Sequence, residues 1–406
     1  MTDLEGENYD VIIVGAGMVG ASAACLLAQV QCVSQNRPLK IALIESTAGK
    51  QFDSGVFDPR VAAVTERSRQ MLESCGVWHN IAQLRASPYL AMQVWDAEST
   101  GRIGFDCHEI HQPNLGHIVE NSVIVQALLT QVKALDNVDL ICPATICDYQ
   151  NNDQSIRVQL DDSRWLSAAL LIAADGANSQ VRQYFEVETK EWSYHQEAIV
   201  TTIKTENPNQ QTAWQCFTQK GPLALLPLNN NGDLHRSSIV WSQESATAKS
   251  LMALSEEQFC AELSRSSEYC LGNVVAIDKR FSFPLVQRHA IDYVMPRIAL
   301  VGDAAHSIHP LAGQGVIMGF SDVEVLVEEL ARALRRGNNI GDKLILARYQ
   351  RRRKPDNLAA MALMEACNKL FIANQLPLRF LRSLGMSRLN KFNVVKNELI
   401  KLAMGL

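Results

Sequence analysis

A glycine-rich turn between an apolar strand and a helix constrains the fold of this chain more than any other feature. Residues 9–14 form a β-branched apolar run typical of a buried parallel strand, and Gly15-x-Gly17-x-x-Gly20 follows it at once. A helical pattern then runs to about residue 30, and residues 39–44 form a second apolar strand that ends at Glu45. This order predicts a βαβ unit, in which a helical crossover joins two parallel strands.

The three glycines and Glu45 meet the requirements of a dinucleotide site. Gly15 permits a tight turn, Gly17 lets the backbone approach a pyrophosphate, and Gly20 allows the helix and strand to pack closely, while the helix N-terminus faces the anion. Glu45 lies 25 residues after Gly20, and its carboxylate can accept both ribose hydroxyls. An acid here disfavours a 2′-phosphate, which leaves NAD or FAD. A glycine turn without a ligand is the alternative.

A later strand that ends in Gly-Asp favours FAD. Residues 299–301 are apolar and run into Gly302-Asp303, roughly 280 residues after the glycine turn. A simple NAD dehydrogenase needs no second cofactor-binding segment so far along the chain. The ribityl chain of a flavin dinucleotide does need a further acceptor, which the Asp303 carboxylate can supply. The alternative role of Asp303 is an N-cap on a following helix.

The segment from His309 to Gly315 precedes a helical pattern over residues 316–334 and has the features of a third flavin-binding element. Gly313 and Gly315 give a backbone that can press against a planar ring, and the helix start directs free N–H groups at that ring. A reduced flavin carries negative charge, which a helix N-terminus stabilises.

The whole pattern predicts an α/β protein: a Rossmann-like FAD-binding domain with an inserted antiparallel-sheet substrate domain and a C-terminal helical tail. Short apolar runs between turn clusters over residues 190–285 indicate the antiparallel sheet, with one helix near residues 256–264. Within residues 57–76 a helix is expected after an extended entry through Asp58-Pro59-Arg60. A second helix is expected over residues 121–135, and a single strand over residues 165–174.

The expected domain boundaries follow from these elements. The FAD-binding domain takes residues 1–80, 113–185 and 288–342, the substrate domain takes residues 81–112 and 186–287, and the tail takes residues 343–406. The tail is expected to be mostly helical, with breaks at Pro355, Pro377 and Gly385.

Charge is distributed unevenly along the chain. The net charge is −5, which argues against wholesale nucleic-acid binding. Residues 343–406, however, hold 13 Lys/Arg and 3 Asp/Glu and so carry +10, while residues 1–342 carry −15. A basic tail on an acidic body suggests an anionic surface as a partner. The basic run of residues 351–354 is interpreted as a solvated helix face.

Neither the cysteines nor the histidines indicate a metal site. The ten cysteines include no C-x-x-C pair, and they are expected to be reduced thiols of a cytoplasmic protein. The histidines show no recognisable metal motif, and structural roles are expected for His108, His111, His117, His306 and His309.

Four further segments complete a resemblance that covers essentially the whole chain. They are Asp58-x-Arg60, Val119-Glu120-Asn121, Asp175-Gly176-Ala177-Asn178-Ser179-x-Val181-Arg182, and Arg348-Tyr349-Gln350-x-Arg352-Arg353. With the three flavin motifs, the chain resembles the flavin-dependent aromatic hydroxylases of the para-hydroxybenzoate hydroxylase type, and in particular the ubiquinone-biosynthesis hydroxylase family. Within that family it is most similar to the bacterial branch that hydroxylates the demethoxyubiquinol ring.

The resemblance implies a role for each matching residue. The ADP half of FAD would lie on Gly15, Ala16, Gly17, Met18, Gly20 and Glu45. The flavin and pyrophosphate region would contact Arg60, Asn121, Asp175, Gly302 and Asp303, and the Asp175-Gly176 motif would also serve the pyridine nucleotide. The isoalloxazine would be bordered by Gly313, Gly315, Val316 and Ile317. The family usually has Asn where this chain has Ile317, a difference that bears on flavin affinity and on the flavin potential.

The resemblance also implies the reaction. NAD(P)H would reduce FAD, dioxygen would form a flavin hydroperoxide, and the aromatic ring of a polyprenyl phenol or quinol would be hydroxylated. The substrate-activating residue is not identified. The basic tail is expected to bind the membrane peripherally or to dock into a ubiquinone-biosynthesis complex. Two alternatives remain: hydroxylation of a soluble aromatic acid held by Arg236, which is expected in a turn, and a non-catalytic scaffold, for which Ile317 is the only support.

Overall fold

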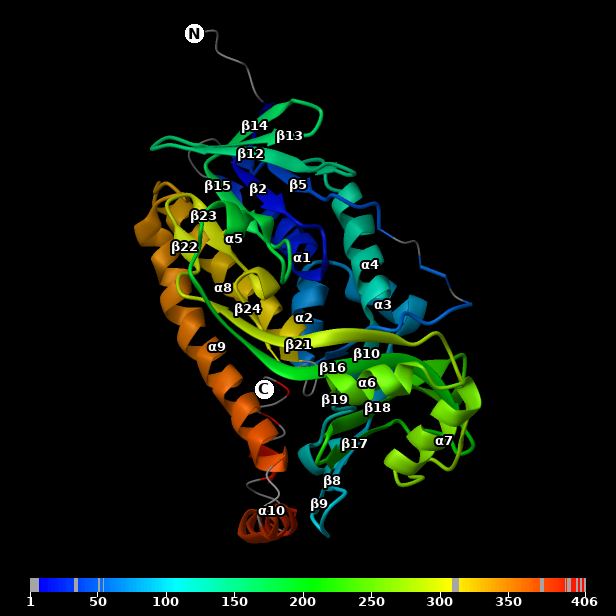
Figure 1. Ribbon diagram of the computed structural model, residues 1–406. Coiled ribbons are helices and arrows are strands. Elements are labelled where there is room, and N and C mark those ends of the chain that lie inside the picture. Colours follow the sequence, from blue (N-terminus) through cyan, green and yellow to red (C-terminus); the bar gives the residue numbers. More distant parts are fainter. Residues whose placement is uncertain are drawn as a thin grey trace.

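The glycine turn and its two flanking strands lie in the middle of a six-stranded sheet (Figure 1). The computed structural model describes residues 7–32, 36–49, 52–53, 55–308, 314–372, 376–390, 392, 396–398, 401 and 404. The strand order is β11-β5-β2-β15-β23-β22, parallel except for the antiparallel pair β22 and β23. The strands are β2 (Val11–Val14), β5 (Ile41–Ile44), β11 (Val138–Ile141), β15 (Leu170–Ala173), β22 (Val294–Met295) and β23 (Ile298–Leu300).

Helices and a second sheet bury this central sheet. Helix α1 (Met18–Leu27) packs against α4 (Asn121–Lys133) and α8 (Gln314–Arg335). A four-stranded sheet adjoins the central one, with β1 (Glu7–Asn8), β12 (Ile146–Asn151), β13 (Ile156–Leu160) and β14 (Trp165–Ala168). Strands buried on both faces read as continuous apolar runs, which is why the sequence signal for β2, β5 and β15 is strong.

A nine-stranded sheet forms the lower half of the molecule in Figure 1. Its order is β24-β21-β16-β19-β18-β17-β8-β9, with β20 pairing off this path. The strands are β8 (Ala91–Asp96), β9 (Arg102–Asp106), β16 (Thr189–Thr205), β17 (Thr212–Thr218), β18 (Gly221–Asn230), β19 (Asp233–Glu244), β20 (Val274–Ile277), β21 (Phe281–Ala290) and β24 (His306–Ser307). The antiparallel sheet expected over residues 190–285 is therefore present, with two strands contributed from residues 91–106.

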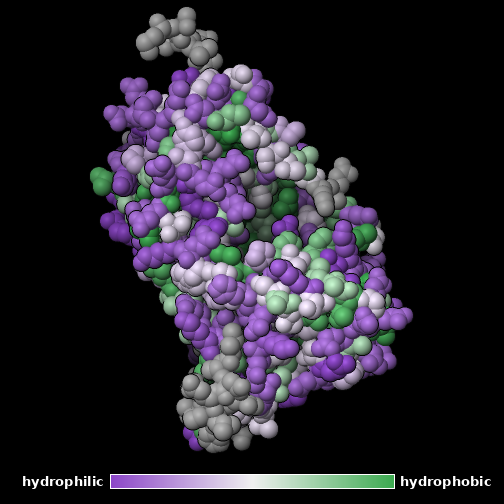
Figure 2. Space-filling view, in the orientation of Figure 1, coloured by the Kyte–Doolittle hydropathy of each residue, from purple (hydrophilic) through white to green (hydrophobic). Residues whose placement is uncertain are grey.

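The two faces of this sheet have different covers. Trp95 packs with helices α6 (Ser245–Met252) and α7 (Glu256–Ser266), where one helix was expected. Its neighbour Val94 points to the opposite face and packs with the C-terminal helices. Figure 2 shows a hollow between the part of the molecule that holds the six-stranded sheet and the part that holds the nine-stranded sheet. Apolar side chains lie inside this hollow.

The C-terminal region consists of α9 (Lys343–Ile372) and α10 (Leu376–Leu389). Helix α9 has 30 residues, about 45 Å at 1.5 Å per residue, and runs from the upper to the lower part of the molecule (Figure 1). The predicted breaks at Pro355 and Gly385 are wrong. A buried stripe with helical spacing holds α9 together through Pro355: Leu346, Tyr349, Arg353, Asn357 and Met361. Pro377 is the second residue of α10, where proline is tolerated.

Two further expectations need correction. The helix expected directly after Arg60 begins later, because β6 (Val61–Val64) pairs with β10 (Gly116–Glu120) before α2 (Glu66–Ser74) begins. Thr65 sets the start of α2, since its side chain accepts a hydrogen bond from the Ser68 N–H. The segment 165–174 forms two strands, β14 and β15, in different sheets.

The remaining elements are short. They are β3 (Gln31–Cys32), β4 (Arg37–Pro38), α3 (Trp78–Arg85), β7 (Ser87–Tyr89), the 3-10 turn η1 (Cys107–Ile110), α5 (Gln180–Tyr184) and the 3-10 turn η2 (Gly302–Ala304). In the described part of the chain, no helix has both the length and the apolar character of a membrane span.

Candidate functional site

The glycine turn lies where β2 meets α1 and closes against two neighbouring strands. Gly15 has φ +98°, and its N–H donates to the carbonyl of Ile44 at 2.8 Å. A Cβ on Gly15 would lie 2.5 Å from the carbonyl oxygen of Ala174. Only glycine fits this position, because both the backbone angle and the space exclude a side chain.

Gly17 is different, because nothing lies within 4 Å of the position its Cβ would take. It is the N-cap of α1 and has no side-chain cap, so the first N–H groups of the helix remain free to meet a ligand. Gly17 borders a cleft of about 360 Å³ that is also lined by Gly15, Glu45, Thr145 and Asp175. This cleft lies at the turn where the sequence predicted a pyrophosphate.

Glu45 stands at the rim of this cleft and is fixed to the turn. Its Oε2 accepts the N–H of Ala16 at 2.8 Å, and its Oε1 accepts the N–H of Thr47 at 3.0 Å. These bonds hold the carboxylate at the end of β5, beside the start of α1. An acceptor in this place suits ribose hydroxyls.

Asp175 faces the same cleft from the end of β15. Its Oδ2 accepts the N–H of Val181 at 3.1 Å, while its Oδ1 is buried and has no hydrogen-bond partner among the described residues. Arg182, in the same motif, is buried and donates to the carbonyls of Ala304 at 2.9 Å and Ala177 at 2.6 Å. Arg182 therefore ties the Asp175 motif to the turn η2.

Arg60 and Asn121 are neighbours although they lie far apart in the sequence. The N–H of Asn121 donates to the carbonyl of Arg60 at 3.0 Å. Asp58 accepts the N–H of Arg60 at 3.0 Å and that of Ser122 at 3.1 Å, so one carboxylate joins the two segments. The buried Oδ1 of Asn121 finds no partner in the described ranges, and the Arg60 residue is exposed.

An ion pair between Arg85 and Glu120 supports this corner and was not predicted. Arg85 Nε lies 2.8 Å from Glu120 Oε2, both side chains are buried, and Glu120 Oε1 accepts the N–H of Asp58 at 2.7 Å. Burial raises the pKa of Glu120, against the opposing effects of the Asp58 N–H and Arg85. The Arg85 guanidinium also stacks on Phe52 and Phe57. The motif around Asn121 contained Glu120, but nothing in the sequence indicated its partner.

Gly302 and Asp303 form η2 directly beside α1. Gly302 has φ +58°, and a Cβ there would meet Val19 Cγ2 at 3.1 Å. The Asp303 residue is exposed, but protein surrounds its carboxylate so closely that desolvation raises its pKa, against the opposing effect of His306. Asp303 lies inside η2, whose N-cap is Val301, so its alternative role as a helix N-cap is wrong.

The third flavin motif is only partly visible. Gly313, with His309 and the residues between them, lies outside the described residues. Gly315, Val316 and Ile317 form the first turn of α8 and are half-buried, and a Cβ on Gly315 would meet nothing within 4 Å. The open position of Gly315 leaves room for a close ligand approach.

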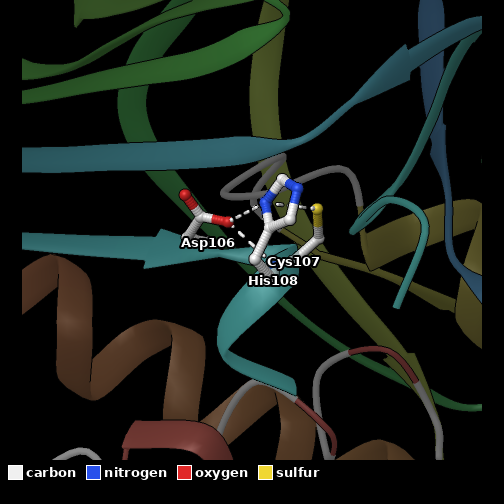
Figure 3. A group of neighbouring side chains, drawn as sticks. All are labelled: Asp106, Cys107 and His108. Carbon is white, nitrogen blue, oxygen red and sulfur yellow. Dashed lines mark hydrogen bonds and ion pairs between the residues drawn. The ribbon is translucent and has the colours of Figure 1, made fainter. Parts of the chain in front are cut away.

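Three of the five histidines expected to be structural have identifiable partners, namely His108, His117 and His306. His306 is buried and bonds Asp322 at 2.6 Å, and His117 packs edge-on against Trp78. Asp106, Cys107 and His108 lie close enough to share a metal ion (Figure 3), although no such grouping was expected. Asp106 Oδ1 accepts both the backbone N–H of His108 at 2.9 Å and its ring Nδ1 at 2.7 Å. This is the cap of η1, so a local turn accounts for the cluster.

Arg236 does not lie in a turn as expected but in β19. Its guanidinium stacks over Phe57 and lies 4.0 Å from both Asp233 and Asp278. Two carboxylates already balance its charge, so it is poorly placed to bind the carboxylate of a soluble aromatic acid.

The residues present fit FAD. The uncapped start of α1 at Gly17 suits a pyrophosphate, and Glu45 suits a ribose. The buried oxygens of Asp175 and Asn121 lack partners in the described parts of the chain, and such atoms call for a ligand or water.

Three comparisons place this geometry among known proteins. The family model described as "FAD binding domain" matches residues 8–364. The chain is 37% identical to 3-demethoxyubiquinol 3-hydroxylase of Escherichia coli, over 99% of this chain and 100% of that protein. It is 34% identical to the mitochondrial ubiquinone biosynthesis monooxygenase COQ6 of Xenopus tropicalis, over 97% of this chain and 93% of that protein. The crystal structure of PqsL, a probable FAD-dependent monooxygenase from Pseudomonas aeruginosa, superposes with a TM-score of 0.77 at 20% identity, over 94% of this chain and 100% of that one, and shows the fold alone.

Proposed function

Because this chain belongs to the FAD binding domain family and, within it, to the ubiquinone-biosynthesis hydroxylases, we propose that it hydroxylates the aromatic ring of a polyprenyl phenol or quinol. The observation that carries the proposal is end-to-end similarity to 3-demethoxyubiquinol 3-hydroxylase, and the cleft at the start of α1, which would suit the ADP half of FAD, supports it. A demethoxyubiquinol is accordingly the first substrate to test.

The chain's own residues would bind FAD, orient the substrate ring and shield both from water. Glu45 and the start of α1 would hold the ADP half, and Asp303, Arg60 and Asn121 would contact the flavin half. Bound FAD would supply the transfer of two electrons from NAD(P)H and the activation of dioxygen. The hollow between the two sheets would receive the ring and exclude water from it (Figure 2).

NAD(P)H would bind transiently. The sequence holds one dinucleotide fingerprint, since Gly313, Gly315 and Gly319 have a different spacing and the sequence pattern predicts no strand directly before them. A reductant that leaves after electron transfer needs no permanent second site.

The C-terminal region would bring the protein to its substrate at a membrane surface. Helix α9 exposes Leu358, Leu363 and Leu370 to solvent, at 42%, 59% and 41%. Residues 343–406 carry a net charge of +10. Arg353 and Arg382 within them are held in buried ion pairs, and each basic residue that lies near an anionic surface contributes about 1 kcal/mol. The variant with Leu358→Ser and Leu363→Ser should float less with anionic vesicles at low salt than the unaltered protein. Equal flotation would argue for docking to partner proteins instead.

The experiment that tests the proposed function compares two substrates. Protein loaded with FAD is given NADH or NADPH, dioxygen and either a polyprenyl demethoxyquinol in detergent or a soluble phenolic acid. We expect hydroxylated product from the quinol and little from the acid, because Arg236 is already paired. Product from the acid alone would contradict the choice of substrate, and no product from either would favour the scaffold.

A further inference from the structure

A buried carboxylate beside the turn η2 receives four hydrogen bonds. Asp322, on α8, is fully buried. Its Oδ2 accepts the N–H of Gly302 at 3.1 Å and His306 Nε2 at 2.6 Å. Its Oδ1 accepts Arg353 Nε at 2.9 Å and Asn357 Nδ2 at 3.1 Å. Each oxygen thus has two donors, which nearly fills the acceptor capacity of the group.

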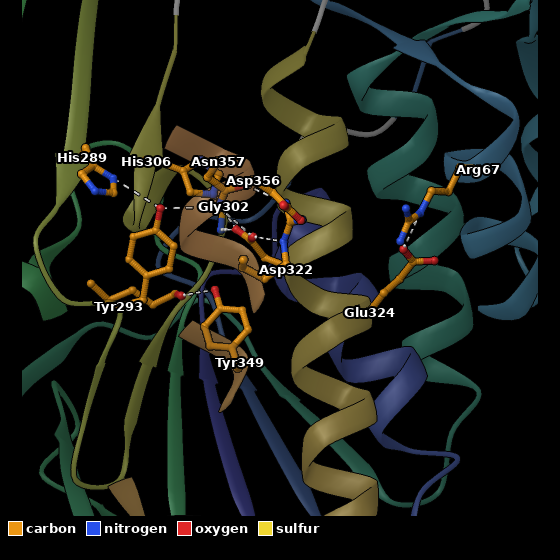
Figure 4. A network of polar contacts seen from close by, with 12 residues as sticks. Arg67, His289, Tyr293, Gly302, His306, Asp322, Glu324, Tyr349, Asp356 and Asn357 are labelled. Atoms are coloured by element: carbon orange, nitrogen blue, oxygen red, sulfur yellow. Dashed lines mark hydrogen bonds and ion pairs between the residues drawn. The ribbon is translucent and has the colours of Figure 1, made fainter. Parts of the chain in front are cut away.

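These bonds join four separate elements (Figure 4). Gly302 begins η2, His306 begins β24, Asp322 belongs to α8, and Arg353 and Asn357 belong to α9. Arg353 was expected on a solvated face, but it is buried and also donates to Asn357 Oδ1 at 2.6 Å. In the same helix, Tyr349 donates to the carbonyl of Leu300 at 2.8 Å, in the strand that leads into η2.

The buried charge favours a single arrangement of these elements. Burial alone would raise the pKa of Asp322, but His306, Arg353 and Asn357 outweigh it, so the pKa lies below its usual value and the carboxylate is ionised. A buried ion that loses a partner is costly, and the network therefore resists rearrangement.

The turn η2 is held at both ends. Asp322 holds its first residue through the Gly302 N–H, and Arg182 holds the carbonyl of its last residue, Ala304, at 2.9 Å. Asp303 lies between these two anchors, in a residue that is exposed at its surface while protein surrounds its carboxylate. The direction of Asp303 therefore depends on Asp322 more directly than on any contact of its own.

We propose that Asp322, oriented by His306 and Arg353, is a positioning residue that fixes the Gly302–Asp303 turn for the flavin half of FAD. The proposal rests on the proposed function only in that the chain binds FAD. It assigns a role to three residues, His306, Asp322 and Arg353, that would not themselves touch the cofactor.

The test separates positioning from general stability with a matched pair of variants. His306→Gln places an amide N–H near the position of Nε2 and keeps the bond to Asp322, whereas His306→Leu removes it. Titration of the apoprotein with FAD, followed by visible absorption, gives the dissociation constant and the band shape of the bound flavin. A group that acts on a ligand site through another residue changes the affinity typically by about 5- to 150-fold, so tenfold is a moderate effect. We expect His306→Leu to weaken FAD binding by about tenfold and His306→Gln by less than about threefold.

A control breaks a comparable buried pair far from the turn. Asp96→Asn weakens the pair with Arg382 at 2.6 Å, in the lower sheet, and should lower Tm without changing FAD affinity or the flavin spectrum. Asp322→Asn should act as His306→Leu does if it folds. An unchanged FAD affinity and spectrum in folded His306→Leu, with only Tm lowered, would overturn the proposal. Unaltered protein that binds FAD but hydroxylates nothing would reject the proposed function and leave this inference standing, whereas a failure to bind FAD would overturn both.

Discussion

Gly20 lies so close to Gly15 that a Cβ on Gly20 would stand 1.9 Å from the carbonyl oxygen of Gly15. The Cβ position of Gly17, three residues earlier, has nothing within 4 Å. The glycines of one motif thus serve two purposes. Gly20 serves packing within the protein, and Gly17 faces the space for a ligand.

This difference predicts opposite effects for two alanine substitutions. Gly20→Ala should cost roughly 1–3 kcal/mol of folding free energy, because the backbone must shift to relieve the contact. Gly17→Ala should leave the free energy of unfolding almost unchanged and weaken FAD binding by about tenfold or more. Denaturant titration and FAD titration of both variants check the prediction. A stable Gly20→Ala protein, or full FAD affinity in Gly17→Ala, would show that the two roles are assigned wrongly.

Glu45→Ala should weaken FAD binding by about 10- to 100-fold, since hydrogen bonds to a charged group contribute about 1.5–3 kcal/mol. Glu45→Gln keeps one acceptor oxygen and should therefore lose less FAD affinity than Glu45→Ala. Glu7, an exposed acid outside the cleft, gives the control, and Glu7→Gln should bind FAD normally. Normal affinity in Glu45→Ala would place the ribose elsewhere.

Arg382 and Asp96 anchor α10 to the lower sheet through a pair in which both side chains are buried. Arg382→Met should cost about 3–5 kcal/mol, because it leaves Asp96 buried without its partner. Adding Asp96→Asn should recover much of that loss. The control is the pair of exposed Lys369 and half-buried Glu365, and Lys369→Met should change stability by less than about 1 kcal/mol. Urea unfolding measures all four proteins, and a small loss in Arg382→Met would mean that α10 contributes little.

His289 should make stability fall as the pH drops. Burial lowers its pKa from 6.5 to about 4, with smaller effects from Lys354, His306 and Lys190. The folded protein keeps the ring neutral while the unfolded chain takes up a proton, so this contribution is complete above about pH 6.5 and is lost as the pH falls toward 4. Between about pH 7 and 5, the unaltered protein should lose about 2 kcal/mol more than His289→Gln. Parallel curves for the two proteins would reject this assignment.

A substitution at Ile317 tests whether the backbone at the start of α8 is enough to bind the flavin ring without a polar side chain at this position. Ile317 is half-buried in the first turn of α8, at a position where the resemblance to the family leads us to expect Asn. Ile317→Asn should leave FAD affinity within about threefold and shift the flavin reduction potential, because a polar group replaces an apolar one beside the ring. The potential is measured by dye-coupled reduction. An apoprotein that binds FAD only after the substitution would support the scaffold alternative for the natural chain.

Local features of the fold could be predicted from the sequence, and features that depend on distant contacts could not. The strand, glycine turn and helix at residues 11–27 form from neighbouring residues, and their pattern is direct. The strand Val61–Val64 was missed because it exists only through pairing with Gly116–Glu120. Pro355 was expected to end a helix that buried packing carries past it.

The same distinction applies to the candidate site. The motifs supplied Glu45, Asp175 and Asp303, because each follows an apolar strand in a recognisable motif, although Glu45 also contacts Ala16, 29 residues away. Arg85 and Asp322 were not predicted, because their partners lie 35 and 31 residues away and a buried charge has no local sequence signature. The assignment of individual residues to FAD, like the domain boundaries, stays a prediction.

The most direct test of the central claim is the origin of the oxygen atom in the product. FAD-loaded protein, NAD(P)H and a polyprenyl demethoxyquinol are incubated under ¹⁸O₂, and the product is analysed by mass spectrometry. The account predicts one ¹⁸O atom in a new ring hydroxyl, because one atom of dioxygen enters the C–H bond and the other leaves as water. A hydroxylated product that takes its oxygen from water, or no hydroxylated product from protein that binds FAD, would contradict the account.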